Sequence, residues 1–101
     1  MEQLNDTNFQ SVVIDSGKKV LVDFSAEWCG PCRMVEPVLE EMSKSHKDVE
    51  FKRVNIDDYE DLAQQYGVMS IPCMVLFDGG KEVSRVVGFR SREELEKMIG
   101  E

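Results

Sequence analysis

Cys29 and Cys32 stand three positions apart, where an apolar run typical of a buried strand gives way to an apolar pattern of helical period. Residues at i and i+3 share one face of a helix, so thiols placed there can close or open a disulfide with little backbone movement. The unpaired N–H groups and positive dipole end at a helix start favour the thiolate of Cys29, which is the nucleophilic form. The spacing therefore predicts a reversible dithiol switch, in which Cys29 attacks and Cys32, one turn into the helix, is shielded and resolves.

The other interpretations of this pair are a structural disulfide and one half of a zinc site. A closed zinc site takes four ligands, and the further candidates here are Cys73 and His46, the single histidine. Because these do not form a second closely spaced pair, we expect no metal. We also expect no bound cofactor, since the protein's own thiols would carry the electrons.

Asp23 is a second candidate, because it interrupts the apolar strand predicted at 20–25. A strand at the centre of a parallel sheet is buried on both faces, and burial of a carboxylate is costly and raises its pKa. Such a group suits a proton acceptor for Cys32 when that thiol must become a thiolate. The alternative is an edge or solvated Asp23 without a catalytic role.

Composition narrows the classes of protein that fit this chain. A length of 101 residues predicts one domain, at 1–101. The net charge of −8, from 20 acidic and 12 basic residues, argues against nucleic-acid binding and fits a soluble monomer. No apolar run approaches the ~20 residues of a membrane helix, and residues 1–6 lack the basic and apolar regions of a signal peptide. We therefore expect a cytoplasmic protein that does not bind membranes.

The elements that must position these residues follow from the apolar pattern and from turn and cap signals. The first half of the chain is expected to form a helix capped by Asn5 or Asp6 and ended by Gly17, then strand 20–25, then a helix that extends to about Ser45 and is kinked at Pro37. The second half is expected to form strand 50–56, helix 59–66 and a hairpin of strands 74–77 and 83–87 around Gly79-Gly80. A last helix begins at the capping box Ser91–Glu94. The order βαβ, helix, hairpin, helix predicts an α/β domain with a mixed sheet.

Several motifs, in this order and at these separations, resemble the thioredoxin family over nearly the whole chain. Val-Asp-Phe-Ser-Ala-Glu-Trp-Cys-Gly-Pro-Cys at 22–32 is similar to its active-site signature, and Ser70-Ile71-Pro72 to its cis-proline segment. Further matches are Val-Asn-Ile-Asp at 54–57, Phe77–Lys81 and Val87-Gly88. The resemblance implies a thioredoxin fold, with a central mixed β-sheet flanked by helices on both faces.

The resemblance also implies roles for individual residues. Gly30 and Pro31 between the thiols are the variant of a reductant, and Asp23 matches the buried proton-transfer group. Pro72 matches a cis proline beside the disulfide, which would leave the backbone of Ile71 free to pair with an extended substrate segment. An apolar landing surface around the thiol would then comprise Trp28, Gly67, Val68, Ile71, Val87 and Gly88. The alternative for the apolar members of this set is ordinary core packing.

Three positions depart from the family's pattern. Arg53 stands where the family usually has a lysine near the aspartate, and arginine stays charged at any relevant pH, so a part of that lysine in proton handling would not carry over. The alternative for Arg53 is a solvated strand residue. Ser25 replaces a tryptophan of some members. Cys73 replaces the commoner threonine, and two interpretations stay open for it: an inert buried thiol, or a regulatory or intermolecular one.

The function that the resemblance implies is reduction of protein disulfides through the Cys29–Cys32 pair by way of a mixed disulfide. The expected partners are disulfide-containing proteins and a thioredoxin reductase, either flavin-containing and NADPH-dependent or ferredoxin-linked. Two rival functions are an oxidase or isomerase on the same fold, and a binding module whose redox chemistry is incidental. The Gly-Pro pair between the cysteines argues against the oxidase or isomerase.

Overall fold

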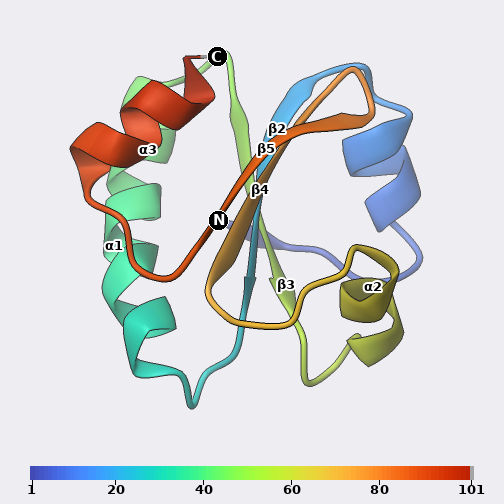
Figure 1. Cartoon of the computed structure of the whole chain (residues 1–101). Coiled ribbons are helices and arrows are strands. Elements are labelled where there is room, and N and C mark those ends of the chain that lie inside the picture. The colour runs from blue at the N-terminus through green and yellow to red at the C-terminus, as the bar shows by residue number, and fades with distance from the viewer. Residues whose placement is uncertain (101) are drawn as a thin grey trace.

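The computed structural model describes residues 1–100, and β-strands form the centre of the molecule (Figure 1). The strands of this range are β1 (Glu2–Gln3), β2 (Lys19–Ser25), β3 (Glu50–Asn55), β4 (Cys73–Asp78) and β5 (Lys81–Val87). The helices in the same range are η1 (Gln10–Ile14, a short π-helix), α1 (Gly30–Ser45), α2 (Glu60–Gln65) and α3 (Arg92–Ile99).

The strands form one mixed sheet with the order β1-β3-β2-β4-β5. Strands β1, β3 and β2 are parallel, whereas β4 runs antiparallel to β2 and β5 antiparallel to β4. Helices α1 and α3 cover one face of the sheet, and η1 and α2 cover the other (Figure 1). The predicted fold class, an α/β domain with helices on both faces of a mixed sheet, is confirmed.

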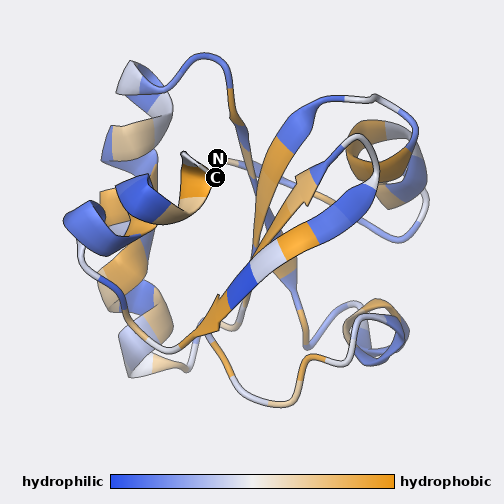
Figure 2. Ribbon diagram, turned by 45° about the horizontal axis from the view of Figure 1, so that its top comes forward, coloured by the Kyte–Doolittle hydropathy of each residue, from blue (hydrophilic) through white to orange (hydrophobic). Residues whose placement is uncertain are grey.

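Strand β2 is buried on both faces because it lies between β3 and β4 and under both helix layers. Successive residues of a strand point to opposite faces. Val20, Val22 and Phe24 accordingly pack in the cluster that contains Phe9 and Val13 around η1. Leu21 packs on the other face, in a cluster with residues of α1 and α3: Val35, Leu39, Met42, Leu95, Met98 and Ile99. Hydrophobic residues recur every three or four positions among hydrophilic ones in α1 and α3, as amphipathic helices require (Figure 2).

The helices and strands expected from residue 20 onward are present, with ends that differ by one or two residues from those predicted. The N-terminal end differs in two further ways. Strand β1 was not predicted, because a two-residue strand carries no alternating pattern. The first helix is a five-residue π-helix whose N-cap is Phe9, without a side-chain cap, and whose C-cap is Asp15, so the bounds expected at Asn5 or Asp6 and at Gly17 were wrong. The side chain of Asn5 instead accepts hydrogen bonds from the N–H groups of Thr7 and Asn8 in the turn before this helix. The capping box of Ser91 and Glu94 is confirmed at the start of α3. Helix α1 runs through Pro37, and the kink expected there stays a prediction.

Candidate active site

Cys29 and Cys32 are joined by a disulfide where β2 ends and α1 begins, with their Cα atoms 5.2 Å apart. Cys29 is the N-cap of α1, and its Sγ accepts a hydrogen bond from the N–H of Cys32 at 3.2 Å. The extended backbone of Cys29 and the Gly30-Pro31 start of the helix produce this arrangement, since proline is tolerated where an N–H has no helical partner. A helix start that donates an N–H to Sγ stabilises negative charge on Cys29.

The two sulfur atoms differ in their surroundings more than in their burial. Cys29 is 5% exposed and Cys32 is 2% exposed, so Cys29 is less open to solvent than its place beside Trp28 suggests. The reason is packing: Ala26, Ile56 and Ile71 contact the pair. Cys29 nevertheless lines a surface groove that Cys32 does not line, so Cys29 is the sulfur that a docked substrate reaches.

Asp23 lies on the face of β2 that α1 covers, and it is 1% exposed. Neither carboxylate oxygen has a hydrogen-bond partner within residues 1–100. Burial raises the pKa of Asp23 to about 7, while the charge of Arg53 acts to lower the pKa and the charge of Glu36 to raise it. A carboxyl group with this pKa can accept or release a proton at neutral pH.

The groove beside Cys29 has a volume of about 470 Å³ and is largely apolar. It is lined by Trp28, Cys29, Gly30, Pro31, Ile56, Val68, Met69, Ser70 and Ile71. The Ile71–Pro72 peptide bond is cis, and Cys29 Sγ lies 3.8 Å from the carbonyl oxygen of Ile71. This segment therefore borders the sulfur with backbone atoms as well as side chains.

The structure brings together only part of the expected landing surface. Trp28, Val68 and Ile71 line the groove, whereas Gly67, Val87 and Gly88 do not. Gly88 instead supports the proline, because its N–H donates to the carbonyl oxygen of Pro72 at 2.8 Å. Its φ of 90° lies in the region that favours glycine.

Met69 also lines the groove, and its side chain is 95% exposed. This residue was not predicted from the sequence. A lone methionine three residues before Pro72 gives no motif, and its place at the groove depends on the loop between α2 and β4. Its flexible apolar side chain suits contact with varied partners.

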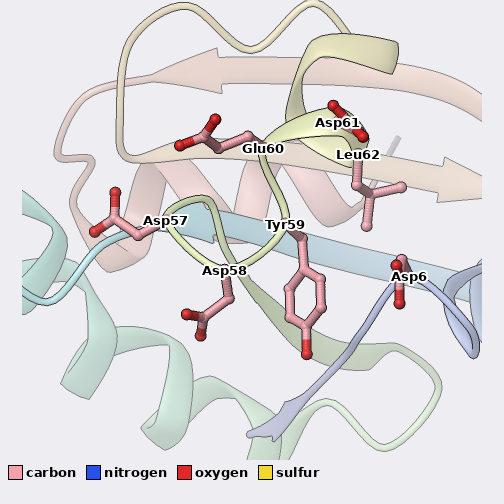
Figure 3. A pocket seen from close by; sticks show the side chains of 7 residues that line it. All are labelled: Asp6, Asp57, Asp58, Tyr59, Glu60, Asp61 and Leu62. Atoms are coloured by element: carbon pink, nitrogen blue, oxygen red, sulfur yellow. The ribbon is translucent and has the colours of Figure 1, made fainter.

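An acidic hollow adjoins the groove through Trp28, which is 70% exposed and whose Nε1 donates to Asp57 Oδ2 at 2.8 Å. The hollow, of about 260 Å³, is lined by Asp6, Asp57, Asp58, Tyr59, Glu60, Asp61 and Leu62 (Figure 3). The hollow was not predicted from the sequence, because Asp6 is distant in sequence from the other residues. Over residues 1–100, no group of acidic, histidine and cysteine side chains is arranged to hold a metal ion.

Cys73 begins β4 and points to the face opposite Asp23, into the cluster with Val22, Phe24 and Val75. It is buried and has no disulfide partner in the described part of the chain. Burial raises the pKa of its thiol, so it is protonated at neutral pH. Its surroundings are those of a core residue.

Comparison with known proteins agrees with this geometry: residues 1–101 match the family model described as Thioredoxin. The chain belongs to the thioredoxin family. It is 46% identical over 99 residues to a thioredoxin of Alicyclobacillus acidocaldarius subsp. acidocaldarius, which covers 97% of this chain and 93% of the relative. It is 48% identical over 94 residues to a thioredoxin of Chlamydia caviae, covering 93% of this chain and 90% of the relative.

A third similar protein is Thioredoxin 1 of Nostoc sp., which is 46% identical over 98 residues, or 96% of this chain and 92% of the relative. Membership of the thioredoxin family, together with the Cys29–Cys32 pair, makes the protein a thiol–disulfide oxidoreductase of protein disulfides. Across residues 1–100, no helix has the length and apolar character needed to cross a membrane.

Proposed function

We propose that the protein reduces disulfides of other proteins with Cys29 as the attacking thiol and Cys32 as the resolving thiol. The Cys29 thiolate attacks one sulfur of a substrate disulfide, forms a mixed disulfide and releases the other substrate sulfur as a thiolate. Cys32 then gives its proton to the Asp23 carboxylate and attacks Cys29 Sγ. The substrate leaves with both of its sulfurs reduced, and the protein is left with the Cys29–Cys32 disulfide.

The observation that carries this assignment is the position of Cys29. It is the N-cap of α1, receives the Cys32 N–H and lines the groove, whereas Cys32 is enclosed. Asp23, on the sheet face under the same helix, is buried without a hydrogen-bond partner among the described residues, and its pKa of about 7 matches a proton acceptor at neutral pH.

The groove would bind an extended segment of the substrate. Backbone atoms of Ile71, before the cis Pro72, would pair with that segment, as in strand addition. Trp28, Gly30 and Pro31 would supply the surface around the sulfur. Gly88 would act indirectly, by holding the carbonyl group of Pro72.

The proposed partners are disulfide-containing proteins and a thioredoxin reductase that restores the dithiol. We propose further that residues 1–101 form one domain and that the protein is a cytoplasmic monomer. Its net charge of −8 supports this, because it disfavours self-association and nucleic-acid binding.

The test is reduction of insulin disulfides, coupled to NADPH and a thioredoxin reductase. Wild-type protein and Cys73→Ser should turn over, whereas Cys29→Ser should show no rate above background. Turnover by Cys29→Ser would refute the assignment. A wild-type protein that binds insulin but never reduces it would favour the binding-module alternative.

A further inference from the structure

Arg53 lies beside Asp23 but is held by two other residues. In the parallel pairing of β2 and β3, Arg53 is the register partner of Asp23. Its Nε donates to the hydroxyl oxygen of the buried Ser25 at 2.7 Å, and its Nη1 lies 3.7 Å from Glu36 Oε2. Ser25 is two residues after Asp23, so both side chains point to the face that α1 covers.

Glu36 reaches the same place from above the sheet. It is four residues after Cys32, and residues at i and i+4 share a helix face, so Glu36 follows Cys32 on the side of α1 over β2 and β3. Three elements therefore meet around Asp23: β2 with Ser25, β3 with Arg53, and α1 with Cys32 and Glu36.

Arg53 and Asp23 do not form a hydrogen bond with each other, although their opposite charges would favour one. Arginine and a carboxylate normally form strong charge-assisted hydrogen bonds, often two in parallel. Here both oxygens of Asp23 lack a hydrogen-bond partner among residues 1–100, and Arg53 is engaged elsewhere. Direct pairing would hold Asp23 ionised and make it a weaker base, because a nearby opposite charge favours the charged form.

We propose that Ser25 and Glu36 are positioning residues that hold the Arg53 guanidinium off the Asp23 carboxylate, so that Asp23 remains an effective proton acceptor for Cys32. The inference rests on the proposed function, which assigns that role to Asp23. Glu36 has a second effect, since its own negative charge opposes ionisation of Asp23. Two further titratable side chains lie near Asp23 among the described residues: Cys32, which is disulfide-bonded, and Cys73, which points to the opposite face.

The test is titration of the Asp23 carboxyl carbon by NMR in the oxidised protein, where Cys29 and Cys32 do not titrate. Ser25→Ala frees Arg53 to turn toward Asp23 and should lower the Asp23 midpoint by roughly one pH unit, the low end of the effect of a nearby opposite charge. Glu36→Gln should also lower it. Glu41→Gln is the matched control, because Glu41 is an exposed acid of the same helix, and it should leave the midpoint unchanged.

A double-variant cycle separates positioning from general disturbance of the structure. Arg53→Gln should raise the midpoint, because it removes the cation. In that background Ser25→Ala should have no further effect, since Ser25 acts only through Arg53. An unchanged or raised midpoint in Ser25→Ala, or a full downward shift that persists without Arg53, would overturn the proposal. Insulin reduction by Cys29→Ser would instead refute the proposed function and leave these midpoints as they are.

Discussion

The burial of Asp23 makes a quantitative prediction about stability. Its pKa is about 7 in the folded protein, against an ordinary value of 3.8. The folded state therefore binds more protons than the unfolded chain between these values, so the free energy of unfolding falls as pH rises through this window. At 1.36 kcal/mol per pKa unit, the full effect is roughly 4 kcal/mol.

Asp23→Asn removes this pH dependence, because its amide does not titrate. Across pH 5 to pH 8, the free energy of unfolding of Asp23→Asn should rise relative to wild type by roughly 3 kcal/mol, with most of the change below pH 7. The amide is also buried, but that contribution does not vary with pH. The variant should therefore be the more stable protein at pH 8, since it no longer buries an ionised carboxylate.

The assay is urea unfolding of the oxidised proteins at pH 5, 6, 7 and 8, followed by circular dichroism. Asp78→Asn, a change of an exposed acid at the end of β4, is the control and should track wild type. A stability difference between Asp23→Asn and wild type that stays constant across this range would refute the argument, because burial would then not raise the pKa of Asp23.

Three further predictions concern the sulfur-containing side chains. Alkylation of the reduced protein at neutral pH, followed by mass spectrometry, should label Cys29 before Cys32, because the helix start favours its thiolate; earlier labelling of Cys32 would reverse their roles. Cys73→Thr should leave coupled insulin turnover nearly unchanged and abolish any disulfide-linked dimer formed with peroxide, and a large loss of turnover would place Cys73 in the relay. Met69→Glu should lower kcat/KM for insulin several-fold, because it puts charge in the apolar groove. Met34→Glu, an exposed change on α1 outside the groove, should not, and equal effects of the two would argue against substrate binding there.

Features that depend on neighbouring residues were predicted well from the sequence. The Cys29–Cys32 turn, the capping box before α3 and the Gly79-Gly80 hairpin each rest on local backbone preferences. The burial of Asp23 followed from its place in an apolar run, because a strand that is apolar on both faces must lie inside the sheet.

Features that depend on contacts between distant segments were not predicted. The hydrogen bond from Arg53 to Ser25 requires the register of β3 on β2, and its ion pair with Glu36 requires the rotation of α1 over the sheet. The place of Met69 in the groove is set by a loop, and β1 is too short to carry a pattern. The cis state of Pro72 was implied by the family resemblance alone, since most Xaa-Pro bonds are trans.

The most direct test of the central claim is to trap the mixed disulfide. Cys32→Ser keeps the attacking thiol and removes the resolving one, so reduced Cys32→Ser mixed with insulin should accumulate a covalent adduct. Mass spectrometry of the digested adduct should place the new disulfide on Cys29, and Cys29→Ser should form no such adduct. An adduct on Cys73, or equal trapping by Cys29→Ser, would contradict the account.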